Sequence, residues 1–138
     1  MGAAAVIVLD TSAIVAILLE EEEAPAFRAA IENARRALVS AVSTVELTAV
    51  AGRDEALSAA ARSFLREPFV IVEPVDRDQA AIAIDAYRRF GRGRHPAALN
   101  LGDVFSYALA RRRGLPLLFK GDGFSRTDIP SATDAQQS

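Results

Sequence analysis

Four acidic residues occupy positions in the sequence where a charged side chain is least expected. Asp10 ends an otherwise entirely apolar run, and Asp122 lies between two glycines directly after another apolar run. Glu46 and Asp103 each fall near the predicted start of a helix. If the apolar runs are parallel strands, their carboxyl ends meet at one edge of a sheet, where ligands bind in such folds. We therefore expect the four carboxylates to converge at that edge.

The composition restricts the chemistry that such a cluster can perform. The chain has no cysteine and a single histidine, which excludes zinc–thiolate sites, cysteine nucleophiles and two-histidine metal sites. Convergent oxygen ligands suit the hard cations Mg²⁺ and Mn²⁺. These ions activate water and hold the oxygens of a phosphodiester during in-line attack. The acids thus predict metal-dependent phosphodiester hydrolysis, whereas the lone His95 has no evident partner and is a poor candidate for a general base.

Each acid also has a simpler structural interpretation. Asp10 can cap the helix that follows it, and Glu46 lies three residues after a serine, the spacing of a capping box. Asn100 can cap a helix that has Asp103 at its third position, where the helix dipole favours an acid. These roles are compatible with function, because a carboxylate in the first turn of a helix lies level with the end of the sheet.

The elements that must position these acids follow from the apolar pattern. Short runs rich in Val, Ile and Leu are typical of strands buried on both faces, and they alternate with stretches of helical period. This alternation predicts an α/β fold with a mostly parallel sheet. The predicted strands are 5–9, 37–40, 69–73 and 115–119. The predicted helices are 13–20, 43–50, 53–66, 76–90 and 101–113. A further helix is predicted after the first one, with the acidic run 20–23 as its first turn.

Size and charge exclude several classes of protein. With 138 residues, 51% of them hydrophobic, the chain is expected to form one domain over 1–138, with an ordered core over about 5–130 and a polar tail over 131–138. The net charge of −2 and the pI near 5.4 exclude nucleic-acid binding by bulk positive charge. No apolar run approaches the roughly 18 residues of a membrane span, and no basic region precedes the first run. We expect a cytoplasmic protein without a membrane partner.

A local basic cluster lies just before the segment that contains Asp103. An acidic site repels RNA unless a basic rim binds the phosphates, so this cluster is a candidate RNA contact. The alternative is a solvated helix end whose arginines complement the dipole. Lys120, which precedes the Asp122 turn, is a further candidate for a phosphate contact. The cluster itself comprises Arg88, Arg89, Arg92, Arg94 and His95.

Four segments, taken together, carry a family resemblance. They are Val-Leu-Asp-Thr-Ser-Ala-Ile over 8–14, Ser-Thr-Val-Glu-Leu over 43–47, the segment 98–110 around Asn-Leu-Gly-Asp, and Leu-Leu-Phe-Lys-Gly-Asp-Gly-Phe over 117–124. In this order the chain resembles the PIN-domain ribonucleases, in particular the toxins of VapBC-type toxin–antitoxin pairs. The resemblance implies a three-layer fold, a Mg²⁺-dependent endoribonuclease that leaves a 5′-phosphate and a 3′-hydroxyl, a homodimer, and a cognate antitoxin that blocks the cleft.

The resemblance also implies roles for particular residues. Mg²⁺, for which Mn²⁺ can substitute, would be bound by Asp10 and Asp103, and these two with Glu46 and Asp122 would form the catalytic acids. Related toxins often have two consecutive acids where this chain has an acid followed by a glycine, so Asp128 is the alternative fourth acid. The supporting residues implied by the family are Thr11 and Ser12, through hydrogen bonds, and Asn100 at the rim.

Two other functions are compatible with the sequence. Phosphotransfer enzymes of the haloacid-dehalogenase-like type also begin with a strand followed by an aspartate, but they require a second aspartate two residues later, where this chain has Ser12. A catalytically inactive PIN-like binding module would have lost one or more of the acids. Its only support is the glycine after Asp122.

Overall fold

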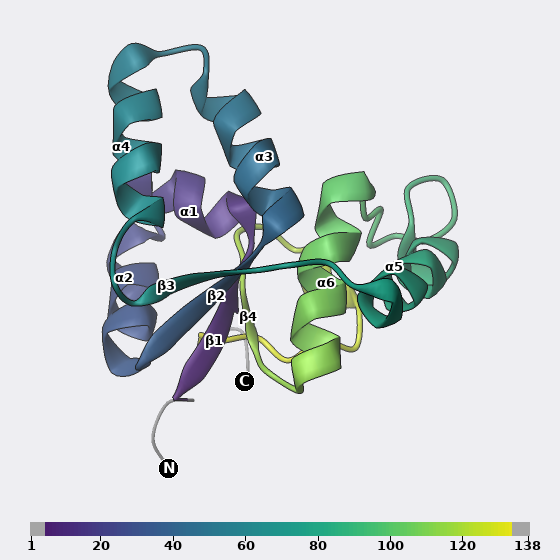
Figure 1. Ribbon diagram of the computed structural model, residues 1–138. Coiled ribbons are helices and arrows are strands. Elements are labelled where there is room, and N and C mark those ends of the chain that lie inside the picture. Colours follow the sequence, from purple (N-terminus) through teal and green to yellow (C-terminus); the bar gives the residue numbers. More distant parts are fainter. Residues whose placement is uncertain (1–4, 134–138) are drawn as a thin grey trace.

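In residues 5–133, the part of the chain that the computed structural model describes, four parallel strands form one sheet in the order β3-β2-β1-β4 (Figure 1). The strands are β1 (Val6–Leu9), β2 (Arg36–Ser40), β3 (Val70–Glu73) and β4 (Leu117–Leu118). The helices are α1 (Thr11–Leu18), α2 (Ala24–Asn33), α3 (Ala41–Ala51), α4 (Glu55–Leu65), α5 (Arg77–Phe90) and α6 (Leu101–Arg113), followed by the 3₁₀ turn η1 (Phe124–Arg126). The α/β fold with a parallel sheet is confirmed.

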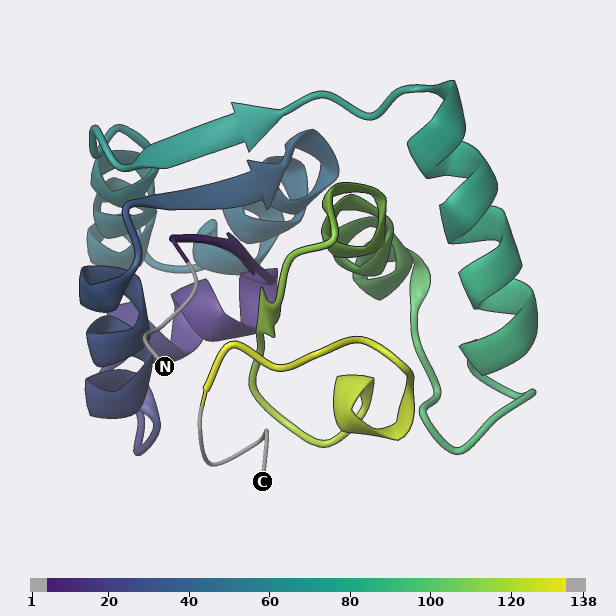
Figure 2. The same ribbon diagram turned by 90° about the horizontal axis from the view of Figure 1, so that it is seen from below.

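The helices cover both faces of the sheet, which gives three layers (Figures 1 and 2). Successive side chains of a strand point to opposite faces, so one strand serves two cores. In β1, Ile7 and Leu9 pack with residues of α1 to α4, whereas Val8 packs with α5 and α6. This explains why the strand is apolar at every position rather than at alternate ones.

The strand order places the end of β1 at a switch point of the sheet. The chain passes from β1 to β2 and β3 on one side, and only later adds β4 on the other side. The backbone amide of Asp10 donates to the carbonyl of Leu118 (2.9 Å), so the first residue after β1 lies beside the end of β4. In open parallel sheets, ligands bind outside the carboxyl ends of the strands at such a point.

Two helices begin earlier than predicted, because no loop separates them from the preceding strands. Helix α1 begins at Thr11 with Asp10 as its N-cap, so Thr11 and the next residue are helical rather than capping residues. Helix α3 begins at Ala41, and its N-cap is Ser40, whose side chain accepts from the amide of Val42 (3.3 Å). The predicted capping box around Glu46 is therefore wrong, because this residue is in the second turn of α3.

The acidic run 20–23 was predicted to form the first turn of α2, and this prediction is wrong. The run instead connects α1 to α2. Glu20 has a positive φ of 54°, and α2 begins at Ala24 with Pro25 in its first turn. Proline suits that position because the amide it lacks would have no partner there. The capping predictions for α6 are confirmed, since Asn100 is its N-cap and Gly114 adopts the left-handed conformation (φ 66°) at its C-cap.

The segment after η1 returns to the sheet. The amide of Leu117 donates to the carbonyl of Pro130, and the amide of Ala132 donates to the carbonyl of Leu117, each at 2.9 Å. Ser131 and Thr133 are buried. The sequence predicts a polar tail from residue 131, but Ser131 and Ala132 lie beside Leu117 of β4, and residues 134–138 of that tail lie outside the described residues.

A buried hydroxyl anchors this returning segment to α6. Tyr107 is 2% exposed, and its hydroxyl donates to Oδ1 of Asp128. The Oδ2 atom of Asp128 forms ion pairs with Arg89 (3.6 Å) and Arg111 (3.5 Å). Partial burial raises the pKa of Asp128, but the Tyr107 hydrogen bond and the two guanidiniums outweigh it and lower the pKa below its usual value. The burial of Tyr107 itself, and then its hydrogen bond to Asp128, raise the pKa of the Tyr107 hydroxyl to about 12.

We expect Tyr107→Phe to lower the free energy of unfolding by about 1 kcal/mol, the usual contribution of one hydrogen bond whose other partner can still be hydrated.

Because the pKa of Asp128 is lower in the folded chain, its ionised form stabilises the fold above the unfolded-state pKa, near 4, and this contribution is lost as the pH falls. The difference in melting temperature between the wild type and Asp128→Asn should therefore shrink between pH 6 and pH 3. A constant difference would contradict this.

Candidate functional site

Asp10 provides a buried carboxylate at the switch point. The residue is 2% exposed, and its Oδ2 atom accepts from the amide (3.0 Å) and the hydroxyl (2.7 Å) of Ser12. The Ser12 hydroxyl in turn accepts from the amide of Lys120 (3.0 Å), which ties the carboxylate to the segment after β4. The Oδ1 atom is buried and accepts no hydrogen bond from residues 5–133. Burying a carboxylate oxygen without a hydrogen-bond partner raises the free energy of the folded chain, and a bound cation can provide the missing interaction.

Glu46 meets the first turn of α6. Its Oε1 atom accepts from the hydroxyl of Thr11 (2.7 Å), the first residue of α1. A Cβ atom added at Gly102 would lie 2.3 Å from Oε2 of Glu46. The Glu46 carboxylate therefore occupies the space that only a glycine leaves open, between the N-termini of α1 and α6.

Asp103 closes a capping box and also faces the other two acids. Its Oδ2 atom accepts from the amide of Asn100 (2.9 Å), while the Asn100 side chain accepts from the amide of Asp103 (2.8 Å). Burial is the main cause that raises the pKa of Asp103 to about 6, and the charges of Asp10 and Glu46 raise it further. The Asn100 amide and the nearby charge of Arg92 oppose this increase. Three of the four predicted acids therefore influence one another electrostatically.

The donor set fits a hard divalent cation, although several of its oxygens have protein partners. Among residues 5–133, no three acidic or histidine side chains are gathered closely enough to form a complete ligand set. One carboxylate oxygen of Glu46 accepts from Thr11, and one of Asp103 accepts from Asn100. Of these three carboxylates, in the described part of the chain, that of Asp10 has a buried oxygen without a hydrogen-bond partner. A cation there would neutralise the repulsion among three carboxylates.

The fourth predicted acid lies apart from this cluster. The side chain of Asp122 is 81% exposed and pairs with Arg126, four residues further on (3.4 Å). The alternative, Asp128, is engaged by Tyr107 and Arg111, one and two turns beyond Asp103 on α6, and by Arg89 of α5. Within residues 5–133, neither residue forms a hydrogen bond or ion pair with the three clustered acids.

The basic candidates separate into engaged and unengaged side chains. Arg89 pairs with Asp85 and Asp128 and lies over the ring of Phe90, and Lys120 pairs with Glu21 and Glu23. His95 also has a structural role, because its Nδ1 atom accepts from the amide of Ala97 (3.0 Å). The side chains of the other basic candidates, Arg88, Arg92 and Arg94, form no hydrogen bond or ion pair with the described residues.

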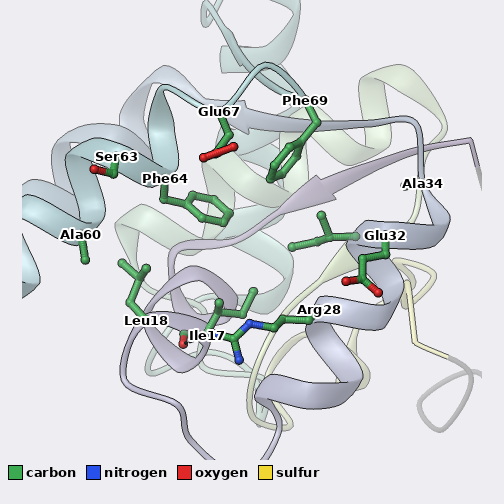
Figure 3. Close-up of a pocket in the computed structure, with 11 residues that line it drawn as sticks. Ile17, Leu18, Arg28, Glu32, Ala34, Ala60, Ser63, Phe64, Glu67 and Phe69 are labelled. Atoms are coloured by element: carbon green, nitrogen blue, oxygen red, sulfur yellow. Dashed lines mark hydrogen bonds between the residues drawn. The ribbon is translucent and has the colours of Figure 1, made fainter.

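A groove of about 620 Å³ lies between α1, α2 and α4, away from the acids (Figure 3). Apolar side chains line it, among them Ile17 and Leu18 from α1 and Phe64 from α4. The charged side chains at its edge are Arg28, Glu32 and Glu67.

Comparisons with known proteins agree with this arrangement. The model of the PIN domain matches residues 7–130. The chain belongs to the PIN-domain family. Ribonuclease VapC42 of Mycobacterium tuberculosis is 47% identical over 128 residues, which cover 91% of this chain and 98% of that relative. The chain is thus a PIN domain of the VapC ribonuclease group, and an endoribonuclease.

Solved structures of PIN-domain toxins share the fold. The toxin VapC20 of Mycobacterium tuberculosis, described as cleaving the sarcin–ricin loop, aligns with a TM-score of 0.73 at 19% identity, over 89% of this chain and 95% of that one. A toxin–antitoxin complex from Klebsiella pneumoniae aligns with a TM-score of 0.66 at 17% identity, over 86% and 89% of the two chains.

The family assignment bears on the other functions that the sequence allowed. It gives no support to a phosphotransfer enzyme of the haloacid-dehalogenase-like type. The inactive PIN-like module has no support in the site either, since Asp10, Glu46 and Asp103 are all present. None of the helices within residues 5–133 has the length and apolarity needed to cross a membrane.

Gly102 is a position of the candidate site that the sequence analysis missed. A glycine inside a helix costs about 1 kcal/mol relative to alanine, and its presence in the first turn of α6 could have indicated a close approach by another group. The group that approaches is the carboxylate of Glu46.

We expect Gly102→Ala to keep or slightly raise the melting temperature while strongly reducing RNA cleavage. The new methyl group collides with the flexible end of Glu46, which can move away without disturbing the core, and alanine favours the helix. Thermal melting and a cleavage assay on the same protein test this. The control is Gly52→Ala at the end of α3, where the added Cβ atom would contact only backbone oxygens, the nearest at 3.2 Å. This variant should keep its activity. Full cleavage by Gly102→Ala would show that the position of Glu46 is unimportant.

Proposed function

We propose that this PIN domain is the toxin of a type II toxin–antitoxin pair, a cytoplasmic, Mg²⁺-dependent endoribonuclease that acts through Asp10, Glu46 and Asp103. The observation that carries the proposal is the buried, unpartnered Oδ1 atom of Asp10, in a site where burial and then the charges of Asp10 and Glu46 raise the pKa of Asp103. The 47% identity to Ribonuclease VapC42 supports RNA as the substrate. Mn²⁺ is the expected substitute for Mg²⁺.

Each of the three acids has a proposed role. Asp10 and Asp103 would hold the ion, which supplies water activation and charge neutralisation at the scissile phosphate. Ser12 fixes the rotamer of Asp10 through two hydrogen bonds to the same oxygen. Thr11 orients Glu46, which would position the attacking water, and Asn100 holds Asp103 at the rim. Asp122 is the proposed fourth acid, and it would have to leave its ion pair with Arg126 to join the other three.

We expect Asp10→Asn and Glu46→Gln each to reduce Mg²⁺-dependent cleavage by at least about 100-fold while the chain stays folded. Loss of a residue that only supports a metal ligand already reduces metal affinity or activity by about 10–100-fold.

Mg²⁺ should raise the melting temperature of the wild type, because it binds only the folded site, and this shift should be lost in Asp10→Asn. Cleavage of an RNA oligonucleotide and melting with and without Mg²⁺ are the measurements.

Glu55→Gln on α4 is the matched control for this experiment. Its carboxylate is 93% exposed and lies outside the site, so the variant should keep both the cleavage rate and the Mg²⁺ shift. Wild-type cleavage by Asp10→Asn would remove that residue from the proposal. Full activity in Glu46→Gln would leave Glu46 with a structural role only.

The groove between α1, α2 and α4 is the proposed surface for the antitoxin. Its apolar lining suits the apolar face of an antitoxin segment, and Glu32 and Glu67 at its edge suit basic side chains of that partner. The groove reaches the end of α1 at Leu18, and eight helical residues, about 12 Å, separate it from the N-terminus of α1 beside the acids. A segment bound there needs only a few extended residues to reach Asp10. The homodimer implied by the family stays a prediction.

We expect Ala60→Arg to keep RNA cleavage and to abolish inhibition by the antitoxin encoded beside this chain's gene. The substitution fills the groove, and its charge repels a basic partner, without removing a packed side chain. Ala59→Arg, exposed on the same helix and outside the groove, is the matched control that should remain inhibited. The measurement is cleavage at increasing antitoxin concentration. Equal inhibition of both variants would place the antitoxin elsewhere.

A further inference from the structure

Two buried serines form a contact between α3 and α6, one helical turn from the acids. Ser43 lies in the first turn of α3 and Ser106 in the second turn of α6, and both are 0% exposed. Their hydroxyl oxygens are 3.2 Å apart, the distance of a hydrogen bond in which either hydroxyl can donate. Each serine is three residues from an acid of its own helix, Ser43 before Glu46 and Ser106 after Asp103.

Ser43 also connects α3 to the start of α1. The Thr11 hydroxyl, which donates to Glu46 (2.7 Å), lies 3.4 Å from the carbonyl oxygen of Ser43. Thr11 directly follows Asp10, so the backbone of Ser43 faces the helix start that holds one acid, and its hydroxyl is bonded to the helix that carries another. The helices of Asp10, Glu46 and Asp103 therefore meet at this serine.

Stability alone does not account for two hydroxyls at this contact. The other buried residues of α3 are Leu47 and Ala51, and the other buried residues of α6 are apolar or aromatic. Burying a hydroxyl has a free-energy cost that one hydrogen bond offsets with little net gain, and alanine is the better helix former. Two alanines would fill the contact without a polar atom. The hydroxyl pair therefore adds a fixed geometry to the contact rather than stability.

A hydrogen bond between two serines fixes the separation of the helices closely. Each hydroxyl is one bond beyond Cβ and turns about a single torsion with a few staggered positions, so the side chains can absorb little movement. At the contact nearer the site, the Glu46 carboxylate occupies the space that Gly102 leaves open. A shift of α6 along α3 at the serine pair therefore changes the distance between the carboxylates of Glu46 and Asp103.

We propose that Ser43 and Ser106 are positioning residues of the nuclease, whose hydrogen bond sets the separation of Glu46 and Asp103. This inference rests on the proposed function of the three acids. Neither serine touches the RNA, because both are fully buried and act through the acid one turn away. The chemical step and the affinity for Mg²⁺ therefore depend on the pair, whereas RNA binding does not.

The first test uses Ser43→Ala/Ser106→Ala, because removing both hydroxyls leaves neither of them buried without its partner. We expect this double variant to melt close to the wild-type temperature. Its kcat for RNA cleavage with Mg²⁺ should fall by about tenfold or more with KM within about twofold, since small displacements of catalytic groups reduce rates strongly. A double variant that does not fold would show that the pair serves stability, and would overturn the proposal.

The single variants separate positioning from stability. Ser43→Ala and Ser106→Ala each leave one buried hydroxyl without its partner, so both should melt at a lower temperature than the double variant. The loss of kcat should nevertheless be similar in all three variants, measured at a temperature where each is folded. A kcat that follows the melting temperature and recovers in the double variant would overturn the proposal.

A second measurement does not depend on catalysis. Mg²⁺ that binds the folded site raises the melting temperature, and the concentration that gives half of the maximal rise reports its affinity. We expect the double variant to need about tenfold more Mg²⁺ than the wild type, the size of effect seen when residues that support metal ligands are removed. An unchanged Mg²⁺ requirement would contradict the inferred link between the serine pair and the acids.

Ser131→Ala is the matched control. Ser131 is 6% exposed, and its hydroxyl is likewise 3.2 Å from another hydroxyl, that of Thr133, in the returning segment rather than on a helix that carries an acid. The variant should melt at a lower temperature, as the single serine variants do, and keep the wild-type kcat and Mg²⁺ requirement. An equal loss of kcat in Ser131→Ala would attribute the effect to stability and overturn the proposal.

The wild type, assayed alongside, separates this inference from the proposed function. A wild type that neither cleaves RNA nor melts at a higher temperature with Mg²⁺ would refute the proposed function. A wild type that does both, beside a double variant with the same kcat and Mg²⁺ requirement, would refute the role of the serines alone.

Discussion

The site depends on a single constraint, which is that a carboxylate must be buried where the central strand ends. Asp10 follows a strand that is covered on both faces, so its side chain cannot reach bulk solvent. The fold compensates for one oxygen with the hydroxyl and amide of Ser12, and leaves the other without a partner. Two more carboxylates are held close to it, so the cost of burying like charges is concentrated at one edge of the sheet. A bound divalent cation would relieve that cost.

The same residues stabilise the helices and form the site. Asp103 completes the capping box of α6 and faces Asp10 and Glu46, and Asp10 caps α1. Function and capping do not compete, because the first turn of a helix that follows a parallel strand lies at the ligand-binding edge. The N-termini of α1 and α6 also contribute partial positive charge near the acids, which offsets part of their repulsion.

The distribution of positive charge complements this acidic edge. The chain is slightly acidic overall, yet three arginines without ion pairs in the described residues gather around the loop between α5 and α6. The other candidates, Arg89 and Lys120, are neutralised by neighbouring acids and stabilise the packing of the returning segment and of the turn after α1. Positive charge without an ion pair thus lies beside the acids in this loop, where Arg92 lowers the pKa of Asp103.

The sequence by itself determined the α/β class, the parallel sheet and the acids Asp10, Glu46 and Asp103. Buried strands must be apolar at every position, and a charge at their ends is conspicuous. Local pattern also located both caps of α6, because capping depends on neighbouring residues. It misplaced the starts of α1 and α3, where strand and helix join without a loop, and so assigned Glu46 a capping role that belongs to Ser40.

Only the tertiary structure decided how the acids are grouped. The strand order brings the ends of β1 and β4 together, and the packing of α3 against α6 places Glu46 over Gly102, a contact between residues 56 positions apart in sequence. It also separated the arginines that are free from those already paired, and left Asp122 exposed beside Arg126. These facts depend on distances between segments far apart in the chain, which residue type and local spacing do not encode.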